Sequence, residues 1–108
     1  MFGKVTIDGR EVAMRGSAAT PYRYKDVFEE DMIKRSQELT DADSLDFAQK
    51  VGFIMAMQAA GEDFGKLNRE QFVQWCDQFT SDGMMEAAGE ILLIYAGNAR
   101  TASEAKKN

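Results

Sequence analysis

The stretch Val51-Gly-Phe-Ile-Met-Ala-Met57 decides the fold, because nothing else in the 108 residues is as uniformly apolar. It lies inside a longer segment, from Ser44 to Ala60, that we expect to be helical. A helix that is apolar on all sides is a buried helix. Seven residues are too few to cross a bilayer, which needs about 20. We therefore predict a central core helix that carries no site itself and supports the elements around it.

Residues 3–15 predict a β-hairpin. Asp8-Gly9 separates two alternating runs and suits a type I′ turn, which needs positive φ at both central residues. With a two-residue loop, Val5 faces Val12. Alternation then gives the hairpin one apolar face, made of Val5, Ile7, Val12 and Met14. An isolated hairpin is marginally stable in water, so this face is expected to lie on the helical core.

The segment from Thr20 to Leu39 predicts two short helices. Threonine at position 20 can cap the first helix, and Pro21 is tolerated at its first position. The acidic run at 29–31 predicts a break or bend there. A second helix is then expected to reach about Leu39.

Capping residues mark the remaining helices. Asp43 or Ser44 is predicted to cap the central helix, and Gly61 to end it in a left-handed conformation. Asn68 is predicted to cap the next helix, and the last helix is expected to end near Gly97. These two helices show apolar stripes, made of Phe72, Trp75, Cys76 and Phe79 in the first and Met84, Ala88, Ile91, Leu92 and Tyr95 in the second.

The predicted fold class is α+β, mostly α, with an N-terminal β-hairpin packed on a bundle of four or five helices. We expect one globular domain over residues 1–99, with the hairpin at about 3–15 and helices at about 21–98. Residues 100–108 contain no apolar side chain larger than alanine, and we predict a loose C-terminal tail.

Composition excludes several classes of function. A net charge of -5 gives no broad positive field for a phosphate backbone, so nucleic-acid binding is not expected. Without histidine and with one cysteine, zinc lacks its preferred ligands. The stretch Asp41-Ala-Asp43 begins like a calcium loop but lacks the later ligands and the glycine at the turn. No phosphate-binding glycine pattern occurs, and we expect no catalytic residue, cofactor or metal.

The compartment is predicted from two features. The N-terminus lacks the basic start and apolar run of a signal peptide, and the single cysteine cannot form an internal disulfide. We therefore expect a reducing, cytoplasmic location and no membrane insertion. The apolar neighbours of Cys76 indicate a small buried thiol rather than a nucleophile.

Methionines and tyrosines are the candidates for partner binding. Methionine-rich surfaces adapt to helical partners, although methionines also fill gaps in a core. Two tyrosines flank Arg23 at a helix start, and tyrosine and arginine are enriched at binding hot spots. At least one of those tyrosines must face the core. The candidate partner-binding residues are Tyr22, Tyr24, Met84 and Met85.

The N-terminal third combines several features in a fixed order. The stretch from Lys4 to Arg15 has an Asp-Gly turn, and a small-residue link leads to an aromatic helix start, with Phe28 and Asp31 after it. In this it resembles tail assembly chaperones of long-tailed (siphovirus-type) bacteriophages and prophages of Gram-positive hosts. The resemblance covers about residues 4–35. That family often has glycine after the phenylalanine, where this chain has Glu29, so we expect a milder bend.

The resemblance implies an assembly role without catalysis. Such chaperones bind the long, helical tape measure protein, keep it soluble and help the tail tube protein polymerise around it. They tend to self-associate in the host cytoplasm and are absent from the mature virion. Many also exist as a longer form made by translational frameshifting. The C-terminal Lys106-Lys107-Asn108 can be encoded by a slippery run ending A AAA AAC.

A binding mode follows as a hypothesis. Met84, Met85 and the Tyr22–Tyr24 region would border a groove that takes an apolar helical stripe of the tape measure protein. The acidic surface would keep the complex soluble. The alternatives are a structural tail or head–tail connector protein retained in the virion, or a small host-directed regulatory binding protein. An enzyme is the least expected class.

Overall fold

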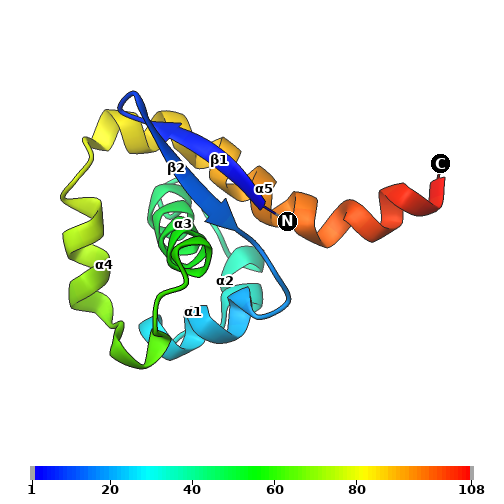
Figure 1. The fold of residues 1–108 in the computed structure, drawn as a ribbon, viewed down its shortest axis with the longest axis horizontal. Helices are drawn as coiled ribbons and strands as arrows, with labels where there is room; N and C mark the ends of the chain where they lie inside the picture. Colours follow the sequence, from blue (N-terminus) through cyan, green and yellow to red (C-terminus); the bar gives the residue numbers. More distant parts are fainter. Residues whose placement is uncertain (1, 108) are drawn as a thin grey trace.

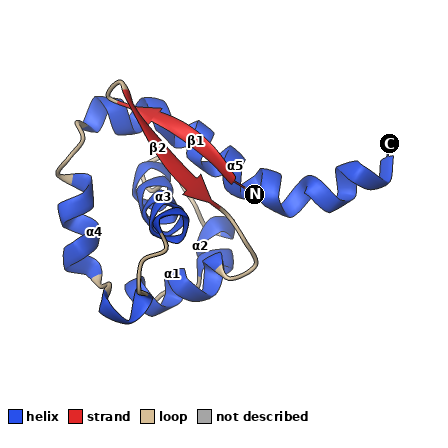
Figure 2. Ribbon diagram, viewed as in Figure 1, coloured by secondary structure: helices blue, strands red, loops and turns tan. Residues whose placement is uncertain are grey.

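The computed structural model describes the backbone of residues 2–107 and the side chains of residues 2–97. Within this part, a two-stranded hairpin precedes five α-helices (Figure 1), and Figure 2 separates the two kinds of element. The elements are β1 (Phe2–Ile7), β2 (Arg10–Arg15), α1 (Thr20–Phe28), α2 (Met32–Gln37), α3 (Ser44–Ala60), a 3-10 turn η1 (Phe64–Lys66), α4 (Arg69–Cys76) and α5 (Ser81–Lys107). The predicted class, α+β and mostly α with an N-terminal hairpin, is confirmed.

The hairpin has the predicted register. Val5 pairs with Val12 in an antiparallel ladder. The turn has positive φ at both central residues, 53° at Asp8 and 78° at Gly9, as a type I′ turn requires. Successive side chains alternate between the two faces of the hairpin, so Val5 and Met14 are fully buried while Lys4 is exposed. The hairpin therefore covers the helical core.

Helix α3 is the centre of the molecule, as the sequence predicts. Residues 51–56 are all buried, and β2 and α5 pack against this helix (Figure 1). Gly52 allows the closest approach. A Cβ atom there would lie 3.2 Å from the Ile91 Cδ1 atom of α5 and 3.5 Å from the Met14 Cε atom of β2. The glycine inside this helix thus brings three elements together.

A row of aromatic rings attaches α4 to the rest of the fold. Phe72 of α4 lies edge-on to Phe28 of α1, with 4.9 Å between ring centroids. Trp75 meets Phe53 of α3 at 5.8 Å and Phe79 at 5.2 Å. Edge-to-face geometry is the favourable arrangement of aromatic pairs. Ring packing therefore holds α4 in place.

Some predicted caps are confirmed and others are wrong. Asn68 caps α4 with a complete capping box, and Gly61 ends α3 at φ 71°. Thr20 does not cap α1, because it lies inside the helix and its hydroxyl accepts a hydrogen bond from the Ser17 N–H. Asp43 makes no cap bond to α3, since its carboxylate is bound to Arg35 and Thr40 instead. The cap rule assumes that a polar side chain has no competing partner.

Ser44 does not cap α3 either. It is the first residue of the helix, and its hydroxyl donates to the Thr40 carbonyl at 3.0 Å. A side chain that donates backward in this way does not serve the free N–H groups of the first turn.

The chain bends at Glu29, as predicted, but the expected milder bend is wrong, because glutamate here takes the backbone conformation of a glycine. Glu29 has φ 56°, the left-handed conformation that glycine favours, and the next helix is capped by Asp31. The helix that follows ends at Gln37 rather than Leu39.

Helix α5 does not end near Gly97. Its backbone continues as a helix to Lys107, and Figure 1 shows this part extending beyond the rest of the fold. Residues 98–107 include three alanines, two lysines, one arginine and one glutamate, which are good helix formers, and contain no glycine or proline. Of the predicted loose tail, residues 100–107 are therefore helical in backbone, while Asn108 lies outside the described residues.

Candidate partner-binding surfaces

The four predicted binding residues fall into two classes. Tyr22 and Met85 are exposed, at 75% and 61% of their surface, whereas Tyr24 and Met84 are buried, at 0% and 1%. One pair of candidates belongs to α1 and the other to the start of α5, and α3 lies between these helices in Figure 1. The four side chains therefore do not form one surface, and only two of them are available to a partner in this conformation.

Tyr24 is a core residue with a polar anchor. Its ring packs edge-on against Phe28, at 5.0 Å between centroids, and its hydroxyl donates to the Glu30 carboxylate. Burial, and then this hydrogen bond, raise the pKa of the Tyr24 phenol. Residues four apart lie on one face of a helix, so Tyr24 shares a face with Phe28, whereas Tyr22 lies on a different face.

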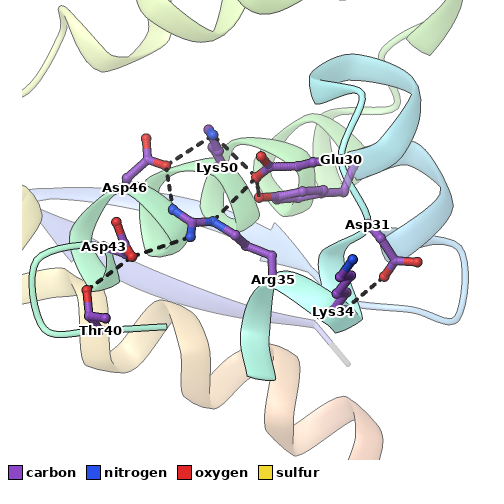
Figure 3. A network of polar contacts seen from close by, with 9 residues as sticks. Glu30, Asp31, Lys34, Arg35, Thr40, Asp43, Asp46 and Lys50 are labelled. Carbon is purple, nitrogen blue, oxygen red and sulfur yellow. Dashed lines mark hydrogen bonds and ion pairs between the residues drawn. The ribbon is translucent and has the colours of Figure 1, made fainter. Parts of the chain in front are cut away.

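A network of ion pairs continues from Glu30 (Figure 3). Arg35 of α2 lies between acidic side chains, with its Nη1 atom 3.4 Å from Asp43 and its Nη2 atom 3.7 Å from Asp46. Lys50 of α3 bridges Asp46 at 3.0 Å and Glu30 at 3.4 Å, and its side chain is only 9% exposed. The network therefore ties the bend after α1 and helix α2 to the first turns of α3.

The side chains of this network are paired with one another by ion pairs and hydrogen bonds. The hydrogen bond from Arg35, and then that from Thr40, hold the pKa of the Asp43 carboxyl below its ordinary value. Among the described residues, no buried side-chain nitrogen or oxygen lacks a hydrogen-bond partner. A general acid or base needs a pKa moved toward neutrality, and the shift at Asp43 is in the opposite direction.

Among the exposed large apolar side chains, four lie on two surfaces. A shallow pocket of about 410 Å³ lies between the start of α1 and α2, lined in part by Tyr22, Lys25 and Ile33. The second surface is the outer side of α5, where Met85 and Leu93 are each about three-fifths exposed. These two residues lie eight positions apart and share one side of the helix with Gly89.

A groove of about 360 Å³ lies beside β2. One wall is the strand at residues 11–13, and the opposite wall is the end of α3. On α3 the wall is made of small side chains, Ala56, Ala59 and Ala60, together with Met57. Met57 is half-buried, so the central helix reaches a surface here. Trp75 and Phe79 supply the aromatic part of the lining.

Cys76 is a half-buried thiol with no activating partner among the described residues. Burial, and then the neighbouring Asp77 carboxylate, raise the pKa of the Cys76 thiol to about 11. The Gln49 amide donates to its sulfur at 3.7 Å. A thiol that stays protonated at neutral pH is a poor nucleophile.

The described residues hold no group of three or more histidine, cysteine, aspartate or glutamate side chains placed to bind a metal ion. None of the helices in this part of the chain is both long enough and apolar enough to span a membrane.

Comparisons with known proteins give no match. No protein-family model matches the chain, and neither curated proteins nor solved structures yield a similar one. Inferences about function therefore rest on the residues and surfaces described above.

Two contacts important for the fold were missed by sequence reasoning. The Asp8 carboxylate accepts hydrogen bonds from the Thr80 N–H at 2.6 Å and hydroxyl at 2.7 Å, so the hairpin turn is fastened to the start of α5. The Gln58 amide donates to the Arg15 carbonyl at 2.5 Å and the Thr20 hydroxyl at 2.9 Å. Both contacts join residues far apart in sequence, and a local pattern carries no signal for them.

Proposed function

We propose that this protein is a tail assembly chaperone of a long-tailed bacteriophage or prophage. In this role it binds the tape measure protein in the host cytoplasm, keeps it soluble and promotes assembly of the tail tube protein around it. The observation that carries the proposal is the order of features over residues 4–35, from the Asp-Gly hairpin to the bend that follows Phe28. The role needs no catalytic step, cofactor or metal.

The exposed apolar side chains support a binding role. A tape measure protein presents apolar helical stripes before the tube surrounds it, and a helical partner docks by packing such a stripe on an apolar surface. Met85 and Leu93 on the outer side of α5 offer such a surface, within a chain of net charge -5 that favours solubility. We assign the contact to this side of α5.

Co-expression with the tape measure protein from the same genome tests the role. The wild-type chain should increase the soluble fraction of the tape measure protein and co-purify with it. Met85→Glu should abolish both effects, because it places a charge on the contact surface, while the exposed position keeps the domain folded. Met85→Leu is the matched control and should retain both effects.

Several results would contradict the proposal. Unchanged co-purification of Met85→Glu would exclude the α5 surface, and failure of the wild-type chain to solubilise the tape measure protein would exclude the chaperone role. Mass spectrometry of purified particles separates the alternatives, because a chaperone is missing from them and a tail or connector protein is retained. A slippery heptamer at codons 106–108 with an overlapping frame would add independent support.

A further inference from the structure

The outer edge of β2 faces the groove beside α3 with free backbone groups. A type I′ turn joins Ile7 and Arg10 as a hydrogen-bonded pair. Such pairs alternate along an antiparallel ladder, so Val12 also bonds to β1. The N–H and C=O groups of Glu11 and Ala13 therefore point away from β1. Over the described part of the chain, no backbone hydrogen bond outside the hairpin ladder reaches these two residues.

The free edge has a defined end. The next outward carbonyl along β2, that of Arg15, already accepts a hydrogen bond from the Gln58 side chain at 2.5 Å. At the other end, the Arg10 guanidinium donates to the Gln78 carbonyl at 2.6 Å and lies 4.6 Å above the Phe79 ring. The edge of β2 is therefore occupied at both ends, and the backbone groups of two residues between these ends remain free.

The shape of the groove fits an extended chain. Its α3 wall presents the methyl side chains of Ala56, Ala59 and Ala60 opposite the strand, which leaves about 360 Å³ open. A helix is about 10 Å wide and satisfies its own backbone groups, so it makes no use of a strand edge. An extended chain offers its backbone to the edge and points alternate side chains to the groove and to solvent.

The chemistry of the occupant follows from the two faces of the hairpin. On the groove side, Met57 and Trp75 favour apolar side chains. On the solvent side, Glu11 pairs with Lys4 of the neighbouring strand at 3.6 Å. A strand added on the other side of β2 places a residue beside the same carboxylate, and opposite charges on adjacent strands are favourable.

We propose that the free edge of β2 binds an extended segment of a partner protein as a third strand. The segment has apolar residues facing Met57 and Trp75 and a basic residue beside Glu11. Strand addition of this kind derives its affinity from main-chain hydrogen bonds and its specificity from alternate side chains. This site is separate from the α5 surface and does not depend on the tail assembly role.

A labelled peptide with the sequence of residues 3–7, Gly-Lys-Val-Thr-Ile, is the probe. It carries the alternation and the lysine that already pair with β2 in the hairpin. We expect saturable binding in fluorescence anisotropy, with chemical-shift changes at the amides of Glu11 and Ala13. Two control peptides carry N-methyl groups on alternate amides. Only the peptide whose methylated amides face β2 should bind more weakly, by at least about tenfold, because N-methylation removes main-chain hydrogen bonds to the strand edge.

Proline variants provide the matched test on the protein. Ala13→Pro removes an outward N–H from β2, and proline is tolerated at a sheet edge. Thr6→Pro makes the same change on the outer edge of β1. We expect Ala13→Pro to weaken peptide binding at least tenfold and Thr6→Pro to leave it within about twofold. If Ala13→Pro does not fold, Ala60→Trp fills the groove from α3, with Ala42→Trp in an exposed loop as its control.

Four results would overturn the proposal. They are the absence of binding up to about 1 mM peptide, an equal loss with both sets of N-methyl groups, an equal loss in both proline variants, and a wild-type dimer that Ala13→Pro converts to a monomer. The last result would identify a second copy of this chain as the occupant. None of these measurements involves the tape measure protein, so a negative result for the strand site does not bear on the proposed function.

Discussion

At the residue scale, Asp8 shows how one side chain serves two parts of the fold. Its backbone takes the left-handed conformation of the turn, and its carboxylate accepts both hydrogen bonds from Thr80 before α5. Sequence patterns predict the first role, because an Asp-Gly pair between alternating runs is a local signal. They cannot predict the second role, because its partner lies 72 residues away.

The Asp8 carboxylate makes stability depend on pH. The hydrogen bond from the Thr80 N–H, and then that from its hydroxyl, hold the pKa of Asp8 below its ordinary value of 3.8. A lowered folded-state pKa contributes stability above the unfolded pKa, and this contribution is lost as the pH falls through the folded value. Asp8→Asn should therefore lower the melting temperature at about pH 7, with a difference that shrinks below about pH 4.

Circular dichroism melts across this pH range test the effect. Asparagine tolerates the left-handed turn, so the substitution removes the charge and keeps the backbone. Asp41→Asn, in the loop before α3, is the control and should melt like the wild type throughout. A difference between Asp8→Asn and the wild type that stays constant with pH would refute the role of the carboxylate.

Glu29 occupies a conformation that suits glycine. With φ 56° it ends α1 in the left-handed region, which costs a residue with a Cβ atom roughly 1–2 kcal/mol. Glu29→Gly should raise the free energy of unfolding by about 1 kcal/mol or slightly less, because glycine also loses more chain entropy on folding. Urea denaturation measures the change. A loss of stability would show that the Glu29 side chain contributes more than its backbone costs.

At the element scale, the apolar run at 51–57 was the most reliable sequence signal, because it predicted the buried central helix. Its burial in α3 follows from its lack of a polar side. The binding residues were predicted less well, because the side chains of adjacent residues on a helix point in different directions. Met84 faces the core and Met85 faces solvent, and the sequence alone does not fix the rotation of α5. The helical extension past Gly97 was missed because glycine was interpreted as a stop signal.

The two glycines of the packed helices should respond oppositely to substitution. A side chain at Gly52 meets Ile91 and Met14, whereas a Cβ atom at Gly89 meets nothing within 4 Å. Gly52→Leu should lower stability by about 1–3 kcal/mol or more through overpacking. Gly89→Ala should raise it by about 0.5–1 kcal/mol, because alanine is the better helix former. Urea denaturation of both variants tests this, and similar shifts would contradict the close packing of α3 and α5.

At the scale of the whole molecule, Gln58 joins three parts of the chain. From α3 it donates to the end of β2 and to Thr20 in α1, and its carbonyl accepts a hydrogen bond from Arg23 at 2.9 Å. Gln58 is only 6% exposed. Buried polar groups are costly unless they are paired, so this amide adds a polar link between the hairpin, α1 and α3.

Removing this amide should weaken the whole fold. Gln58→Ala leaves the Arg15 carbonyl without its partner, and we expect a loss of roughly 1–3 kcal/mol. Gln49→Ala, on the same helix, is the control and should cost less, since its amide donates to the weak acceptor sulfur of Cys76. Denaturation midpoints of the two variants give the comparison, and equal losses would show that helix packing, not the amide, is responsible.

The attachment of the hairpin turn to Thr80 also affects synthesis of the chain. The hairpin is synthesised before α3 and α5, yet its apolar face rests on these two helices. At about 5–20 residues per second, the nascent chain exposes Val5, Ile7 and Met14 for several seconds before residue 80 appears. Completion of the fold must therefore await the last third of the chain, and early termination should leave a hairpin with no core to cover.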